Sequence, residues 1–218
     1  MEISQPVLFT IPLFSGIPVS RTVVVTWIIM AVIILLSLIS TRNWKTVPKG
    51  IQNFVEMVID GLNSFTKTAL GSHWKTFTPY LGTIAIFLII ANIIGIFGIK
   101  PPTSDLSMTA AMAVMSIIVV IIASIKAKGV KGYVKSFFKP MPVIFPMKIL
   151  ELFIRPLSLA ARLFGNIIAA FLIMEIISKM VPIILPAVCS LYFDLFDGLL
   201  QMIIFVFLTM LYIQEAVE

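Results

Sequence analysis

Two arginines within one long apolar segment are the side chains of this sequence that most clearly require a chemical explanation. Arg155 and Arg162 are seven residues apart, so they lie on the same face of a helix, and Asn166 follows one turn later. A charged side chain near the centre of a bilayer costs about 2.5–3.5 kcal/mol on insertion scales, so its presence there indicates function rather than stability. We therefore treat this helix face as a candidate functional site.

The two arginines differ in the partners that their own helix offers. Glu151 precedes Arg155 by four residues, which predicts a structural ion pair within the helix. Arg162 has no acidic residue three or four positions away, so its partner must come from another helix, another subunit or water. We favour a functional role for Arg162 and a structural role for Arg155.

A second polar stripe lies in the last apolar segment. Asp194, Asp197 and Gln201 stand at positions i, i+3 and i+7, which places them on one helix face. This face either pairs with Arg162 and neutralises it, or lines a hydrated passage for ions, as carboxylates and amides inside membranes often do. We favour the passage for Asp194 and leave both interpretations open for Asp197.

Glu175 stands near the far end of the segment that carries Arg162, as a solvated interfacial residue or at the mouth of the same passage. No nucleophile–base set, phosphate-binding loop or metal-ligand cluster is recognisable, and the single Cys189 excludes an intrachain disulfide framework. We therefore expect no cofactor, no metal and no catalytic residue.

The composition indicates a polytopic membrane protein. Hydrophobic residues make up 60% of the 218 residues and charged residues 12%, with a mean hydropathy of +1.10. A soluble domain carries about 25% charged residues. The net charge of +6 arises from lysines in short loops, which argues against nucleic-acid binding and for membrane orientation.

The apolar segments predict five transmembrane helices within a single membrane domain, 1–218. They run over about 22–40, 81–99, 106–125, 149–178 and 183–214. About 20 helical residues cross a core of about 30 Å, so the last two are too long for one upright crossing and should be strongly tilted. Pro182 and Pro186 mark the turn between them, which predicts an antiparallel hairpin whose polar faces can meet.

Residues 51–70 have apolar side chains at helical spacing, which predicts an amphipathic helix on the cytoplasmic surface. The predicted fold is thus all-α, with five transmembrane helices and one surface helix. The loops after the first and third spans are rich in lysine, so we expect them in the cytoplasm, with the N-terminus outside and the C-terminus inside.

The run 156–166, PLSLAARLFGN, resembles the signature of the a subunit of F-type ATP synthase, the membrane stator beside the rotating c-ring. Three further runs resemble that family: 98–106 (GIKPPTSDL), 124–129 (SIKAKG) and 200–212 (LQMIIFVFLTMLY). The resemblance therefore extends over most of the chain.

The resemblance implies roles for individual residues. Arg162 matches the family's essential arginine, which faces the ion-carrying carboxylate of each passing c subunit, and Ser158 belongs to the same signature. Asn166 and Gln201 match polar residues of the outer half-channel, and Asp194 stands where relatives carry an ionisable His or Glu. This sequence has Phe171 where some relatives have Glu, and we hypothesise that Glu175, one turn later, supplies that carboxylate.

The same resemblance implies partners: a c-subunit ring, the b subunit of the peripheral stalk, the remaining ATP synthase subunits and the bilayer of a prokaryotic plasma membrane. ATP chemistry would reside in those partners, and the coupling ion is H⁺ or Na⁺. The alternatives are a self-contained secondary ion transporter, against which no paired broken helices or internal repeat is found, and a structural scaffold. If the chain moves ions only together with a ring-forming partner, both the secondary transporter and the structural scaffold are excluded.

Overall fold

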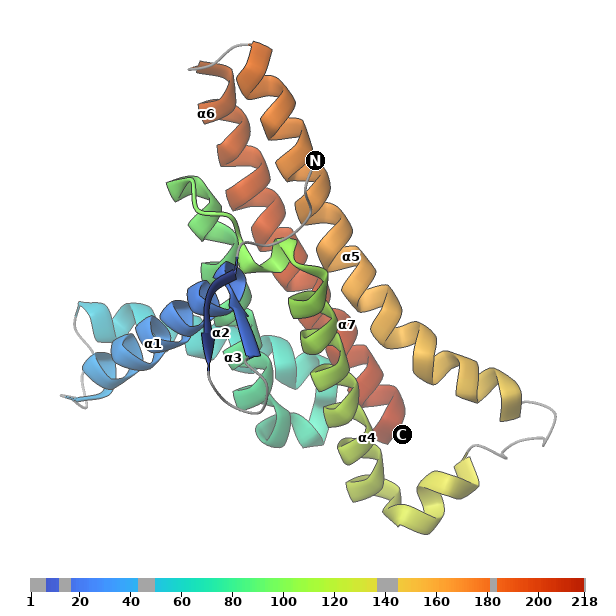
Figure 1. Cartoon of the computed structure of the whole chain (residues 1–218). Helices are drawn as coiled ribbons and strands as arrows, with labels where there is room; N and C mark the ends of the chain where they lie inside the picture. The colour runs from blue at the N-terminus through green and yellow to red at the C-terminus, as the bar shows by residue number, and fades with distance from the viewer. Residues whose placement is uncertain (1–6, 12–16, 43–49, 137–144, 181–183, 218) are drawn as a thin grey trace.

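The computed structural model describes residues 7–11, 17–42, 50–136, 145–180 and 184–217, and most of these residues are helical (Figure 1). The α-helices are α1 Arg21–Thr41, α2 Ile51–Leu70, α3 Trp74–Ile93, α4 Leu106–Ser136, α5 Phe145–Met180, α6 Ile184–Ser190 and α7 Gly198–Val217. Short 3₁₀ turns are η1 Gly71–His73, η2 Ile94–Phe97 and η3 Pro102–Ser104, and a π-helical segment, η5 Leu191–Asp197, joins α6 to α7.

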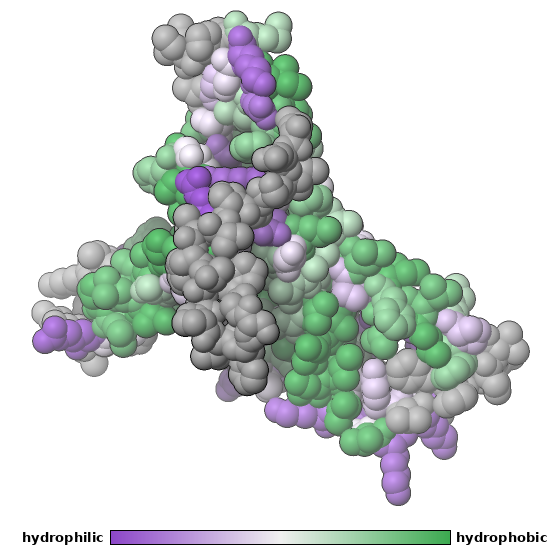
Figure 2. Space-filling view, in the orientation of Figure 1, coloured by the Kyte–Doolittle hydropathy of each residue, from purple (hydrophilic) through white to green (hydrophobic). Residues whose placement is uncertain are grey.

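Five helical segments are long and apolar enough to cross a membrane, which confirms the predicted all-α membrane fold. They are Arg21–Thr41, Gln52–Phe97, Leu106–Tyr133, Phe145–Met180 and Val188–Val217. Figure 2 shows that apolar side chains cover much of the visible surface, with hydrophilic ones along the lower edge. The molecule is therefore a multi-pass membrane protein.

The helices extend further than the apolar runs that predicted them. α3 begins at Trp74 rather than near residue 81, and α4 continues to Ser136 rather than ending near residue 125. Within α4, Gly129 has a φ of 71°, where glycine is favoured, and bends the helix. The sequence pattern ends each span where lysines begin, whereas lysine is a good helix former outside the apolar core.

The N-terminal region departs from the all-helical expectation. β1 Val7–Ile11 and β2 Ile17–Ser20 form an antiparallel pair in which Phe9 lies opposite Val19. Pro18, which cannot donate a ladder hydrogen bond, is tolerated because a strand of a two-stranded sheet has an unpaired edge. That proline concealed the strand from the sequence pattern.

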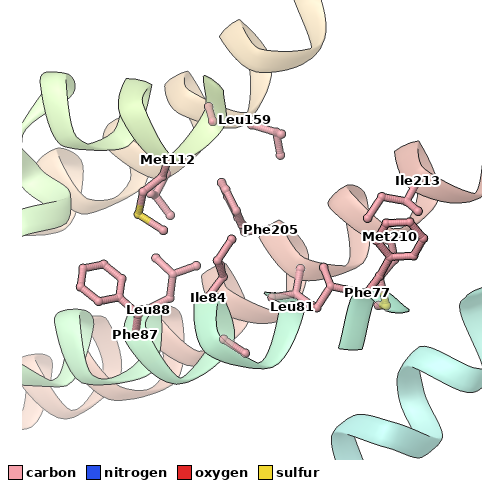
Figure 3. Close-up of a cluster of buried hydrophobic side chains, with 14 of the residues drawn as sticks. Phe77, Leu81, Ile84, Phe87, Leu88, Met112, Leu159, Phe205, Met210 and Ile213 are labelled. Atoms are coloured by element: carbon pink, nitrogen blue, oxygen red, sulfur yellow. The ribbon is translucent and has the colours of Figure 1, made fainter. Parts of the chain in front are cut away.

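The apolar core lies where α3, α4, α5 and α7 meet. Figure 3 shows Phe205 of α7 among Leu88 of α3, Met112 of α4 and Leu159 of α5. Phe205 is 2% exposed, and the other three side chains are also buried. This packing holds α5 and α7 in place as the supports of the polar residues. From α1, Ile29 joins this core and is 1% exposed.

The last two long segments form the predicted hairpin. In Figure 1, α5 runs antiparallel to the α6–η5–α7 segment, and α4 packs against both α5 and α7. Pro186 lies inside α6 rather than in the turn, and Pro182 falls outside the described residues. The tilt of the hairpin in the membrane stays a prediction.

α2 has the predicted bounds and one packed face. The buried Thr66 hydroxyl lies 2.8 Å from that of Thr78 on α3, and the ring of Phe65 stacks on Phe207 of α7 at 6.2 Å. Phe54 and Met57, on another face, are exposed. An amphipathic helix with one packed and one exposed apolar region suits the membrane surface, and that location stays a prediction.

Replacing Gly198 by alanine is expected to destabilise the bundle. A Cβ at position 198 would lie 2.8 Å from the Cβ of Asn92, whose side chain is 2% exposed and donates to the Gly198 carbonyl at 3.0 Å. Overpacking of this kind costs about 1–3 kcal/mol. Thermal unfolding of the purified chain should show a lower midpoint for Gly198→Ala.

The matched control is Gly61→Ala in α2, where nothing lies within 4 Å of the added methyl group. Alanine is favoured over glycine inside a helix by about 0.5–1 kcal/mol, so this variant should be unchanged or slightly more stable. Equal midpoints for the two variants would contradict the packing seen at Gly198.

Candidate functional site

Arg162 lies on the outward face of α5. Its neighbours Ser158 and Ala161 are exposed as well, whereas Leu163 is fully buried on the opposite side. Within the described part of the chain, Arg162 makes no hydrogen bond or ion pair. A guanidinium in a membrane-spanning helix requires a partner, and its five N–H donors suit a carboxylate. None of the described residues fills this role, and another molecule or water can supply the partner.

A polar cluster of Asn166, Asp197 and Gln201 lies between the two arms of the hairpin. The Asn166 side-chain amide donates to Oδ2 of Asp197 at 2.7 Å and lies 3.5 Å from Oε1 of Gln201. Gln201 is only 2% exposed, so this cluster is inside the bundle. The structure thus brings together one residue of α5, one of η5 and one of α7. The polar faces of the two arms meet here, as expected for the predicted hairpin.

Arg162 and Asn166 lie one turn apart on α5, but their surroundings differ. Asn166 is half-buried and turned toward α7, whereas Arg162 is exposed. In the residues that the structure describes, neither Asp194 nor Asp197 pairs with Arg162. The interpretation in which the acidic stripe neutralises Arg162 is therefore not what the structure shows.

The predicted stripe of Asp194, Asp197 and Gln201 is split by the π-helical segment. The i→i+5 bonding of a π-helix widens each turn, so residues three apart no longer share a face as they do in an α-helix. Asp197 faces Asn166, whereas Asp194 lines a cavity of about 180 Å³ with Gly95, Lys100 and residues of α5. π-Helical turns are frequent at functional sites.

Gly95 makes room for the carboxylate of Asp194. A Cβ at position 95 would lie 2.7 Å from Oδ1 and 3.0 Å from Cγ of Asp194. Nothing in the sequence links Gly95 with Asp194, because the two residues are far apart in the chain. Gly95 is therefore a site residue that sequence reasoning missed.

Asn92 fixes the backbone beside this cavity. Its side-chain amide donates to the Gly198 carbonyl at 3.0 Å, and its oxygen accepts from the Thr103 hydroxyl at 2.9 Å. Asn92 and Thr103 are buried and satisfy each other, which makes them a rigid support.

Glu175 is placed apart from Asp194. Its Oε1 accepts from Nζ of Lys179 at 3.0 Å, and it is not among the residues that line the Asp194 cavity. Phe171 does line the cavity, and Nζ of Lys100 lies 5.5 Å from the centre of its ring. Lys100 and Phe171 thus place a cation above an aromatic ring at the edge of the Asp194 cavity.

Arg155 forms the predicted ion pair and a second one. Its Nη2 lies 2.6 Å from Oε1 of Glu151 and 2.7 Å from Oε1 of Glu215 near the end of α7, and its guanidinium lies 4.9 Å from the ring centre of Tyr212. The pair with Glu151 is confirmed. The contacts with Glu215 and Tyr212 fasten α5 to α7, which supports the structural role.

Among the described residues, no group of three or more His, Cys, Asp or Glu side chains is arranged to hold a metal ion. The polar side chains of the hairpin instead offer amide, carboxylate and guanidinium groups in separate places. This arrangement suits the stepwise passage of a small cation better than a fixed binding site.

Comparison with known proteins gives consistent matches over nearly the whole chain. Residues 23–214 match the family model of the ATP synthase A chain. The chain is 36% identical to "ATP synthase subunit a, sodium ion specific" of Propionigenium modestum, over 93% of this chain and 75% of that protein. It is 37% identical to ATP synthase subunit a of Moorella thermoacetica over 93% of both chains, and 34% identical to that of Trichlorobacter lovleyi over 91% and 88%.

Proposed function

The chain belongs to the ATP synthase A chain family, and from this premise we propose that it is the ion-translocating stator subunit of an F-type ATP synthase. It would stand beside a c-subunit ring in a bacterial plasma membrane, together with the b subunit and the remaining subunits. Its N-terminus would be outside and its C-terminus in the cytoplasm. ATP chemistry would remain with the partner subunits.

The observation that carries this proposal is Arg162, which is exposed in a membrane-spanning helix and has no ion-pair partner among the described residues. A carboxylate on a passing ring subunit is a suitable partner, because an opposite charge within a few ångströms favours the ionised form. At an effective dielectric constant of 20 and a separation of 4 Å, the attraction is about 4 kcal/mol before desolvation. Arg162 would release the ion from each arriving site.

The polar cluster and the Asp194 cavity support an outer half-channel. Asp194, Asp197, Asn166 and Gln201 would carry the ion from the outer side toward the ring, with Ser158 beside Arg162 on the ring face. The positive charge of Arg162 would repel a cation that leaked directly toward a second, offset half-channel on the cytoplasmic side. Each charge that crosses 100 mV delivers about 2.3 kcal/mol, which the ring accumulates over several steps.

Ion-driven ATP synthesis in vesicles that carry the whole complex tests this function. We expect one of two gradients, H⁺ or Na⁺, to drive ATP synthesis, and the gradient that does so identifies the coupling ion. The relative from Propionigenium modestum is named as sodium ion specific. Vesicles that contain this chain alone should move neither ion. Ion transport by the chain alone would favour a self-contained secondary transporter instead.

We expect Glu175→Gln to reduce ion-driven synthesis if Glu175 supplies the carboxylate that is missing at Phe171. The reason is its position one turn beyond Phe171, where it can exchange ions with the outer solvent. Lys179→Gln is the matched control, because it removes the partner of Glu175 at 3.0 Å and keeps the carboxylate. Initial rates of synthesis at equal assembly give the comparison.

The control should retain synthesis if the carboxylate itself is needed. An intact Glu175→Gln complex beside an inactive Asp194→Asn complex would show that Asp194 acts without help from Glu175. The compensation hypothesis would then be wrong, whereas the stator function would stand.

A further inference from the structure

A polar pocket lies away from the polar cluster and the Asp194 cavity, at the opposite end of the hairpin from its turn. At the lower end of Figure 1, α4 bends and runs toward the beginning of α5, with the C-terminal end of α7 beside them. The pocket between these three helix ends has a volume of about 130 Å³. Its polar lining comprises Ser124, Lys128, Tyr133, Lys148, Arg155 and Glu215, among others.

The charges in this pocket do not balance. Arg155 pairs with both carboxylates of the pocket, at 2.6 Å from Glu151 and 2.7 Å from Glu215. Lys128 and Lys148 make no ion pair or hydrogen bond within the described part of the chain. Three cations against two carboxylates leave a net positive charge carried by two free ammonium groups, which suits an anion with several acceptor oxygens.

Ser124 also lines the pocket. The residue is only 5% exposed, and its hydroxyl group can donate one hydrogen bond to a group that enters the pocket. The bend at Gly129 (φ 71°) brings Tyr133 to the same pocket, so hydroxyl and ammonium donors converge from both sides of the bend.

The surroundings of the pocket are apolar. Val130 on α4 and Met147, Leu150 and Phe153 on α5 are all more than half exposed. Apolar side chains that border a cationic pocket at the ends of membrane-spanning helices suit an amphiphile, whereas a small soluble anion would gain nothing from them. Basic pockets between helices on the cytoplasmic side of membranes commonly bind anionic lipid headgroups.

We propose that this pocket binds the phosphate headgroup of an anionic phospholipid. Lys128 and Lys148 would pair with the phosphodiester oxygens, and Ser124 would donate to the same group. The acyl chains would lie along the exposed apolar side chains of α5. The bound lipid would fill the gap between the three helix ends, where Arg155 fastens α5 to α7, and this role does not depend on the path of the ion.

Binding of fluorescent phosphatidylglycerol to the purified, delipidated complex tests the proposal, with phosphatidylcholine as the neutral probe. We expect saturable binding of phosphatidylglycerol alone. The double variant Lys128→Gln/Lys148→Gln should bind about 30-fold more weakly, since each lysine near an anionic lipid contributes about a fivefold factor. The charge-conserving variant Lys128→Arg/Lys148→Arg should retain binding, which also shows that substitution there is tolerated.

The matched control is Lys126→Gln/Lys131→Gln, which removes two neighbouring exposed lysines that do not line the pocket. This variant should bind like the wild type. Equal losses in the two double variants would overturn the proposal in favour of general attraction to a basic surface. Displacement of the lipid by millimolar inorganic phosphate would overturn it in favour of a site for free anions.

Discussion

Arg162→Ala is expected to abolish ion-driven ATP synthesis in vesicles that carry the complete complex. The guanidinium is exposed and unpaired in the described structure, so its removal disturbs no internal contact. It does remove an attraction of about 4 kcal/mol toward the ring carboxylate, which corresponds to about a thousandfold change in rate or equilibrium. Arg162→Lys should be intermediate, because an ammonium is more strongly hydrated and lacks the planar fork.

Arg155→Gln is the matched control, because it removes the other arginine of the same helix. That side chain is engaged by Glu151 and Glu215, so its loss should lower thermal stability while coupled synthesis persists in the complexes that assemble. Passive ion leak should rise in Arg162→Ala and not in Arg155→Gln, since only Arg162 would separate the half-channels. Full synthesis by an assembled Arg162→Ala complex would refute the proposed stator role.

The features that sequence reasoning predicted are those that a regular helix displays. A charge within an apolar segment singles out Arg162. A spacing of four residues predicts the ion pair of Glu151 with Arg155. A polar face on each arm of the hairpin predicts the contact of Asn166 with Asp197. Each inference uses only helical periodicity and the cost of charge in lipid. The five spans follow from composition in the same way.

The features that sequence reasoning missed depend on irregular backbone or on distant contacts. The π-helical segment Leu191–Asp197 separates Asp194 from Asp197, although their spacing of three places them together on an α-helix. The contact of Arg155 with Glu215 joins residues 60 positions apart, which no local pattern indicates. The β-hairpin is concealed by proline, and the bend at Gly129 lies beyond the apolar run from which the third span is predicted.

Gly95→Ala is expected to reduce ion-driven synthesis about 10- to 100-fold, although position 95 bears no functional group. The added methyl group would lie 2.7 Å from Oδ1 of Asp194, closer than van der Waals contact allows, so the carboxylate must move. Displacing a functional group by about 1 Å can cost about a hundredfold in rate. Initial rates of synthesis at matched assembly, under the gradient that drives the wild type, provide the measurement.

Gly82→Ala controls for the loss of a glycine from the same helical region, because its methyl group would meet only Cδ1 of Leu62, at 3.6 Å. This variant should keep the wild-type rate. If Gly95 acts through Asp194, then Asp194→Asn should reduce the rate strongly in the wild type and little further in Gly95→Ala, because substitutions that act through one group are not additive. If the rate losses of Gly95→Ala and Asp194→Asn were additive, Gly95 would serve packing alone. The position of Asp194 would then be set by η5 and not by the open space at Gly95.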